Sequence, residues 1–229
     1  MRAFILAAGR GSRMSGLTDK CPKPMLLVKG RPILEHLIVN AIQAGITDFT
    51  IHLGYLGHII SSYFGNGDRL ATRIEYFNAH LNSPEESILA FGKMSSEQIY
   101  CCLCGDTLLS SQQISRLIQT HVALGVTATF VREHGGGHVS SPVSVLANRV
   151  VRSGTGMEDV WVGCNGIVER TFLDASWDIV QTEKVKSISA LMTALATQYP
   201  IGVADLGQVV NLNTPEQLYL VSNGIEDYE

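Results

Sequence analysis

The stretch RAFILAAGRGSRM, residues 2–14, joins an apolar run to a glycine-rich segment. The run RAFILA is almost entirely apolar and predicts a buried strand. Gly9 and Gly11 follow at once, and glycine allows tight turns in which backbone N–H groups can face an anion. The stretch therefore predicts a strand followed by a loop, which suits a phosphate-binding loop, a dinucleotide site or a plain turn.

Apolar runs and segments with helical periodicity alternate along the next part of the chain. We expect helices at 32–45, 55–67, 84–94 and 111–125, and strands at 48–54, 72–77, 98–105 and 126–133. Strands that are apolar throughout, such as QIYCCLCG, are typical of a parallel sheet covered on both faces. The pattern predicts an α/β fold with a mostly parallel, doubly wound, Rossmann-like sheet.

The pattern changes after residue 133. Short strands are expected at 141–146, 149–153 and 159–168, which is typical of an antiparallel insertion. A helix at 185–198, a strand at 199–204 and a helix at 213–223 complete the chain. We found no repeat or linker, so the sequence predicts a single domain over residues 1–229 with a small lobe on the acceptor side around residues 134–170.

Composition narrows the class of protein. Hydrophobic residues make up 45% of the chain and charged residues 17%, as in ordinary globular proteins. The net charge of −4 argues against a nucleic-acid partner. No segment is typical of a signal peptide or a membrane span, so a cytoplasmic location without a membrane partner is expected. The sequence leaves open whether the chain is a monomer or a homo-oligomer.

The cysteines form a second compositional signal. There are five, an odd number, and three of them lie in CCLC at 101–104. Reduced, buried thiols in a cytoplasmic protein explain this count most simply. A zinc site at CCLC is the weakest alternative, because neighbouring side chains on a strand face opposite ways.

The glycine-rich segment fits common nucleotide motifs unequally. A dinucleotide fingerprint needs a third glycine where Met14 stands, and an acidic residue at the end of the next strand, which reads IHLG. The Walker pattern G-x-x-x-x-G-K-[ST] does not occur in this sequence. Arg13 instead adds a positive charge beside the glycines. These features favour a nucleotide loop in which backbone N–H groups and Arg13 face a triphosphate.

Two further charged residues support this interpretation. Lys23 lies between Pro22 and Pro24, which stiffen the backbone around it. Asp106 follows the apolar strand 98–105, at the sheet edge where ligands of open α/β sheets bind. A carboxylate opposite a phosphate loop suits Mg²⁺, although Asp106 could instead cap the next helix.

Several stretches together resemble the sugar-1-phosphate nucleotidylyltransferases, or NDP-sugar pyrophosphorylases, of the short single-domain type. They are ILAAGRGSRM (5–14), KPMLLVKGRPILEH (23–36), GYLGHIISSYFGNG (54–67), RIEYF (73–77), CGDTLLS (104–110) and VVNLNTPEQL (209–218). The resemblance implies transfer of a nucleoside monophosphate from an NTP to a sugar 1-phosphate, with release of pyrophosphate. It also implies Mg²⁺ as cofactor, and an NTP and a sugar 1-phosphate or similar small phosphate as partners.

The resemblance also assigns roles to single residues. Arg13 and Lys23 would be catalytic. The metal ligands would be Asp106 and Asn211, the latter at a position where the family usually has Asp. The acceptor would meet Glu158, Asn165 and Gly166. The nucleotide would bind to Leu6, Ala7, Ala8, Gly9, Gly11, Ser12, Arg13, Lys23 and Gly105.

Three departures from the family pattern leave alternatives open. The stretch HLNSPEESILAF (80–91) replaces the family's base-contacting L-G-T-A-G, and the sugar-side lysine is missing, so neither base nor acceptor is assigned. NSPEESILAF resembles phosphocholine cytidylyltransferases of the same fold. Asn211 could be an ordinary residue of a helix-entry loop. The alternatives are a phospho-alcohol cytidylyltransferase and a non-catalytic nucleotide-sensing module.

Overall fold

The computed structural model of the chain describes residues 1–79, 81, 83–133, 141–153, 160–183 and 188–224. The chain divides into two compact units. Unit 1 comprises residues 1–81, 103–115 and 209–229, and unit 2 comprises residues 82–102 and 116–208. Within the described residues, no helix is both long and apolar enough to cross a membrane.

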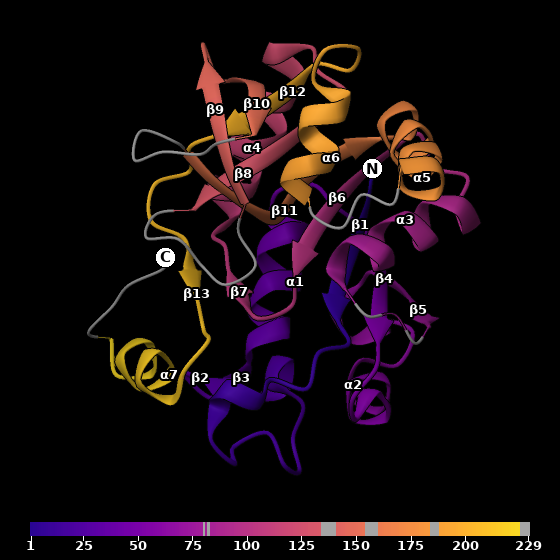
Figure 1. Cartoon of the computed structure of the whole chain (residues 1–229). Helices are drawn as coiled ribbons and strands as arrows, with labels where there is room; N and C mark the ends of the chain where they lie inside the picture. Colours follow the sequence, from indigo (N-terminus) through magenta and orange to yellow (C-terminus); the bar gives the residue numbers. More distant parts are fainter. Residues whose placement is uncertain (80, 82, 134–140, 154–159, 184–187, 225–229) are drawn as a thin grey trace. The chain divides into compact units, whose positions relative to one another are not determined.

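Unit 1 is built on three parallel strands that lie side by side (Figure 1): β1 (Arg2–Ala7), β4 (Asp48–Leu53) and β5 (Arg73–Asn78). Arg2 pairs with Asp48 and Asp48 with Arg73, so all three strands begin and end in register. Their carboxyl ends therefore lie at one edge, from which the loop after β1 leaves. The helices α1 (Ile33–Gln43) and α2 (Gly57–Phe64) follow β1 and β4 in the chain.

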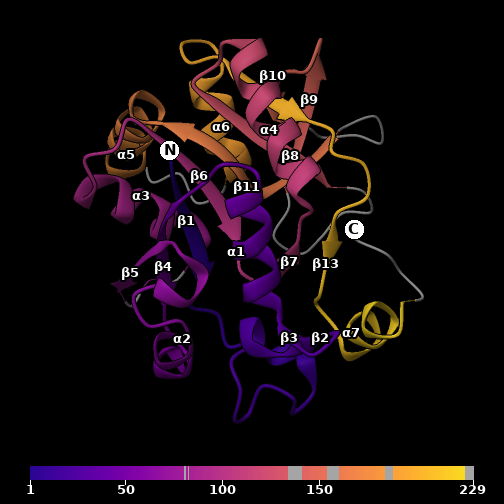
Figure 2. The same cartoon turned by 180° about the vertical axis from the view of Figure 1, so that it is seen from behind.

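A second group of short elements in unit 1 joins distant parts of the sequence. The strand β7 (Thr107–Leu108) pairs antiparallel with β13 (Val210–Asn211), which Figures 1 and 2 show side by side. The helix α7 (Pro215–Ser222) follows, and the hairpin β2 (Leu27–Val28) and β3 (Arg31–Pro32) precedes α1. Buried apolar side chains join these elements: Val28, Ile33, Leu108, Val210, Leu212 and Val221.

Unit 2 contains a mixed sheet. Its strand order is β6-β11-β8-β12-β10-β9, and β9 also pairs with β11. The strands are β6 (Ile99–Cys104, whose last two residues belong to unit 1), β8 (Ala128–Glu133), β9 (Ser141–Leu146), β10 (Arg149–Ser153), β11 (Val160–Glu169) and β12 (Ile201–Ala204). β12 and β8 are parallel, whereas β11 runs antiparallel to β6, β8 and β9.

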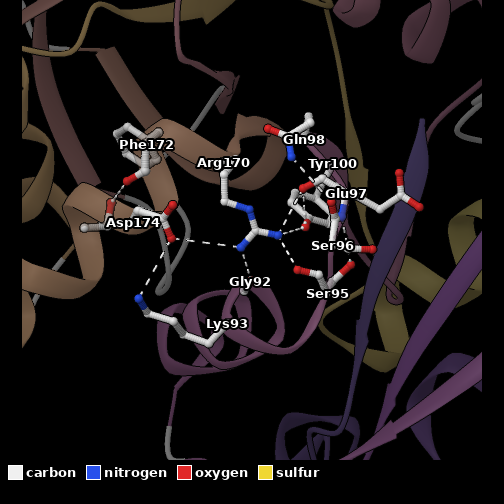
Figure 3. A network of polar contacts seen from close by, with 11 residues as sticks. Gly92, Lys93, Ser95, Ser96, Glu97, Gln98, Tyr100, Arg170, Phe172 and Asp174 are labelled. Carbon is white, nitrogen blue, oxygen red and sulfur yellow. Dashed lines mark hydrogen bonds and ion pairs between the residues drawn. The ribbon is translucent and has the colours of Figure 1, made fainter.

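Helices flank the sheet of unit 2, with α4 and α6 on opposite faces (Figures 1 and 2). The helices are α3 (Pro84–Met94), α4 (Ser111–Leu124), α5 (Arg170–Glu183) and α6 (Ile188–Leu195). Arg170, the first residue of α5, joins several segments (Figure 3). Its guanidinium donates to the carbonyls of Gly92 and Ser95, to the carbonyl of Glu97 at 3.0 Å and to the Tyr100 hydroxyl at 2.5 Å.

The fold class predicted from the sequence is confirmed. The three strands of unit 1 are parallel, and the expected strand at 159–168 is antiparallel to its neighbours. The helix α5 was not predicted, because its buried side includes the polar Ser176, which donates to the Phe172 carbonyl at 2.6 Å. The single-domain organisation stays a prediction, and residues 134–140 and 154–159 of the lobe at 134–170 lie outside the described residues.

Candidate nucleotide-binding site

The glycine loop, residues 8–19, follows β1 and is shaped by Gly11. Gly11 has a φ of 67°, in the left-handed region that favours glycine. A Cβ added there would lie 2.9 Å from the Cβ of Lys23 and 3.2 Å from Cγ2 of Thr18. The Thr18 hydroxyl also donates to the Gly11 carbonyl at 3.2 Å. The loop therefore packs directly on the Lys23 side chain, so the two sequence motifs form one structure.

Lys23 is buried, yet its ammonium has charged and polar partners. The side chain is 7% exposed, and Nζ donates to Oδ2 of Asp106 at 2.5 Å and to Oδ1 of Asn213 at 2.9 Å. The surrounding backbone is a single 3₁₀ turn that begins after Pro22, and the Met25 N–H donates to the Pro22 carbonyl at 2.8 Å. The ammonium thus lies at a fixed place between two oxygen atoms.

Asn213 was not singled out in the sequence, but it lies at the centre of the polar cluster. Its Oδ1 accepts from Lys23 and also from Nη2 of Arg13 at 3.0 Å. Its backbone N–H donates to Oε1 of Gln217 at 2.7 Å, and Gln217 also belongs to the capping box of α7 with Thr214. The helix cap therefore fixes the backbone of Asn213, while its side-chain oxygen faces two cations.

Main-chain pairing explains why Asp106 meets this cluster. The Asp106 carbonyl accepts from the Leu212 N–H at 3.1 Å, and the next residue, Thr107, pairs with Asn211. The carboxylate is 34% exposed, so it can reach a ligand as well as Lys23. Asp106 does not cap α4, because Oγ of Ser110 accepts from the Gln113 N–H at 3.2 Å.

Asn211 has a different environment from that of Asn213. It belongs to β13, and its Oδ1 accepts from the Thr107 hydroxyl at 2.7 Å. Its role as metal ligand stays a prediction. The amide oxygen that shares the Lys23 ammonium with Asp106 belongs to Asn213, two residues further along the chain.

The other residues predicted to bind the nucleotide lie at the end of β1 and in the glycine loop. The Leu6 carbonyl accepts from the Gly105 N–H at 2.9 Å, and a Cβ added to Gly105 would lie 3.1 Å from that oxygen. Ala7 is buried, and Ser12 begins the 3₁₀ turn Ser12–Met14 that carries Arg13. No described atom lies within 4 Å of a Cβ added to Gly9, so the space beside this glycine can admit a ligand.

The residues predicted for the acceptor belong to unit 2. Asn165 and Gly166 lie on β11, and Asn165 is buried. A Cβ added to Gly166 would lie 2.4 Å from the Thr129 carbonyl oxygen, so close packing between strands accounts for this glycine. Glu158 lies outside the described residues. Their roles toward an acceptor stay predictions.

The buried cysteines do not support a zinc site at CCLC. Burial raises the pKa of Cys101 to about 12 and also raises the pKa of Cys102 well above its ordinary value. A zinc ligand must be a thiolate, which such burial disfavours. Among the described residues, no three or more His, Cys, Asp or Glu side chains gather as metal ligands would.

The cluster as a whole suits a phosphorylated ligand. Arg13 and Lys23 provide two positive charges against the single carboxylate of Asp106, and the glycine loop adds backbone N–H groups. Asp106 and Asn213 present hard oxygen atoms, the kind of ligand that Mg²⁺ prefers. The site can therefore bind phosphate oxygens and has donors that fit a divalent cation.

Comparison with known proteins agrees with this chemistry. The chain is 28% identical over 143 residues to a UTP–glucose-1-phosphate uridylyltransferase of Synechocystis sp., and these residues make up 57% of the chain and 37% of the relative. It is 43% identical over 76 residues to an N-acetylmuramate alpha-1-phosphate uridylyltransferase of Neisseria meningitidis serogroup B, and these residues make up 33% of the chain and 33% of the relative. The chain thus spans about a third of the length of these curated relatives.

A solved structure and a family model complete the comparison. The UDP-glucose pyrophosphorylase from Acinetobacter baumanii has a TM-score of 0.79 at 14% identity, over 96% of the chain and 91% of that structure, which shows the shared fold. The family model described as Nucleotidyl transferase matches residues 2–136, more than half of the chain. The chain therefore belongs to the nucleotidyl transferase family.

Proposed function

We propose that this chain transfers a nucleoside monophosphate from an NTP to a sugar 1-phosphate, forming an NDP-sugar and pyrophosphate. The observation that carries the proposal is the cluster of Arg13, Lys23, Asp106 and Asn213 against the glycine loop. The two relatives described above are, by their names, uridylyltransferases that act on a sugar 1-phosphate.

The proposed reaction is an in-line displacement at the α-phosphorus of the NTP. An oxygen of the acceptor phosphate forms the new P–O bond, and the bond to the bridging α–β oxygen breaks as pyrophosphate leaves. The acceptor phosphate is already anionic near pH 7, so the reaction requires no general base. Its main obstacle is the approach of two anions, which positioned cations such as Arg13 and Lys23 would relieve.

We include Mg²⁺ in the proposal, because the donor set fits this ion. The Asp106 carboxylate and the Asn213 carboxamide oxygen both accept from one ammonium, so both face a common position suited to a cation. When bound, Mg²⁺ would neutralise charge on the triphosphate. Asp106 and Asn213 would hold it, Arg13 would contact phosphate oxygens, and Lys23 would turn from Asp106 to the triphosphate.

A cytoplasmic location belongs to the same proposal. NTPs and sugar phosphates are made and kept in that compartment. All five cysteines carry thiols in the structure, and thiols stay reduced in the cytoplasm.

A screen of pyrophosphate release tests the function. The protein is incubated with Mg²⁺, one of the common NTPs and one acceptor at a time. The acceptors are a panel of sugar 1-phosphates and, in addition, phosphocholine. We expect release with at least one NTP and one sugar 1-phosphate. Asp106→Asn should lower the rate by about 10²–10³-fold, as expected for loss of one preorganised charged group.

The matched control is Asp48→Asn, which changes a carboxylate at the amino end of β4, away from the edge where the glycine loop leaves the sheet. This variant should keep the wild-type rate. Release with CTP and phosphocholine alone would replace the sugar acceptor with a phospho-alcohol. Binding of NTP without turnover with any acceptor would contradict the enzymatic proposal and favour a nucleotide sensor.

A further inference from the structure

Tyr55 holds both ends of the glycine loop. Its backbone N–H donates to the Ala8 carbonyl at 3.0 Å, where the loop begins. Its hydroxyl donates to the Asp19 carbonyl at 3.0 Å, where the loop ends. Tyr55, which follows β4, therefore joins the two ends of a loop that lies much earlier in the sequence.

The ring of Tyr55 makes a third contact with the same loop. The Arg10 guanidinium carbon lies 5.2 Å from the ring centroid, within the range of a cation–π interaction. This contact gives the side chain of Arg10, an exposed residue near the start of the loop, a preferred place. The three contacts use three different groups of Tyr55: its N–H, its ring and its hydroxyl.

Gly54 makes these contacts geometrically accessible. A Cβ added to Gly54 would lie 2.5 Å from the Ala8 carbonyl oxygen and 2.8 Å from the Ala8 Cβ. Only glycine permits so close an approach, which brings the Tyr55 N–H to the Ala8 carbonyl. The Gly54–Tyr55 pair thus fixes where the loop leaves the sheet.

We infer that Tyr55 is a positioning residue for the glycine loop and hence for Arg13. Backbone bonds inside the loop are local, such as Met14 N–H to the Gly11 carbonyl at 2.9 Å. Gly11 packs on Lys23 and Arg13 donates to Asn213 in the middle of the loop, whereas Tyr55 fixes its two ends. Because charge stabilisation depends on donors placed in advance, loosening the loop should weaken the contact of Arg13 with the triphosphate. This inference rests on the proposed function of the site.

Amide hydrogen exchange of the glycine loop tests the inference without requiring turnover. Tyr55→Phe removes only the hydroxyl, and Tyr55→Leu also removes the aromatic ring. We expect Tyr55→Phe to speed exchange of the loop amides by about two- to twelvefold, the range for one hydrogen bond. Tyr55→Leu should add about two- to fivefold, the range for an exposed cation–π contact.

Kinetics give the second readout. For Tyr55→Phe, kcat/KM for the NTP should fall by a factor similar to the rise in exchange, with KM for the acceptor unchanged. Tyr55→Leu should be worse, so that the phenylalanine variant restores part of the activity. The control Tyr76→Phe removes a hydroxyl that donates to the Gly65 carbonyl at 2.6 Å, outside the glycine loop. It should change neither readout.

The inference would be overturned if the loop amides of the Tyr55→Leu protein exchanged at the wild-type rate. It would also be overturned if Tyr76→Phe changed loop exchange and kcat/KM as much as Tyr55→Phe does. A similar rise in KM for both substrates would also overturn it, because a general structural defect would do the same. Failure of the wild-type protein to release pyrophosphate would overturn the proposed function instead. The exchange data would still decide whether Tyr55 holds the loop.

Discussion

Replacing Lys23 by methionine should strengthen the binding of a free divalent cation, even though it should destroy activity. In the structure, the Lys23 ammonium lies 2.5 Å from Oδ2 of Asp106 and 2.9 Å from Oδ1 of Asn213. A cation that binds to these oxygens without nucleotide must displace the ammonium and meet its repulsion. Methionine has a similar length and no charge, so both costs disappear.

The size of the effect follows from the exposure of the pair. Two unit charges 4 Å apart attract by about 4 kcal/mol at an effective dielectric constant of about 20, whereas exposed ion pairs contribute about 0–1 kcal/mol. The side chain of Lys23 is 7% exposed and that of Asp106 is 34% exposed, so the pair lies between these limits. Since Asp106 is partly solvated, we expect ~1.4 kcal/mol, which corresponds to about tenfold in affinity.

Calorimetry or electron paramagnetic resonance with Mn²⁺ and no nucleotide measures this affinity directly. Lys23→Met should bind Mn²⁺ about tenfold more tightly than the wild type. Lys20→Met, which removes an exposed lysine just after the glycine loop, should not change the affinity. Adding Asp106→Asn to Lys23→Met should abolish the gain. An unchanged or weaker affinity in a folded Lys23→Met protein would refute the idea that the ammonium competes with the metal.

Three other predictions concern the stability of the fold and, for the glycine loop, the binding of NTP. Arg170→Met should lower the free energy of unfolding by about 3 kcal/mol in urea, because several carbonyls lose a charged donor. Lys93→Met, which loses an exposed ion pair and a cation–π contact with Trp177, should cost only about 1 kcal/mol. Burial lowers the pKa of His121 in the folded protein, so the unfolded chain takes up the proton first as the pH drops. The free energy of unfolding should therefore fall below about pH 6.5. If His121→Gln showed the same pH profile as the wild type in urea unfolding, this reasoning would be wrong. Gly11→Ala should cost about 1–3 kcal/mol in the same measurement, because of its positive φ and its contact with Lys23, while Gly9→Ala should leave stability nearly unchanged but weaken NTP binding in calorimetry.

Most elements of unit 1 could be predicted because their local patterns agree with their final environment. RAFILA is mostly apolar and DFTIHL alternates polar with apolar residues, and both strands are buried in the sheet. The helix α5 shows where this agreement ends. Its buried face is formed by Phe172, Leu173 and Ser176, and Leu173 packs against Gly92, where an added Cβ would lie 2.9 Å from Cδ1. A serine in a core position weakens the apolar periodicity of the α5 sequence, on which a prediction of this helix depends.

The candidate site divides in the same way. Arg13, Lys23 and Asp106 were found because each lies in a local motif that limits its backbone or its place on a strand. Asn213 was missed because its importance comes from the pairing of β7 with β13, which joins residues about a hundred positions apart. A usable signal was present, since the asparagine directly precedes the capping pattern Thr214-Pro215-Glu216-Gln217, which fixes its backbone.

The segments that form the site are joined to one another by main-chain hydrogen bonds. These bonds run from Gly105 N–H to the Leu6 carbonyl, from Tyr55 N–H to the Ala8 carbonyl, and from Leu212 N–H to the Asp106 carbonyl. Because the backbone supplies them, they persist when the side chains that face the ligand change. The side chains that face the ligand can therefore vary while the positions of the glycine loop and Asp106 stay fixed. Gly11 and Gly54 limit this variation, since a Cβ there would lie 2.9 Å from the Lys23 Cβ and 2.5 Å from the Ala8 carbonyl oxygen, too close for the segments to keep their places.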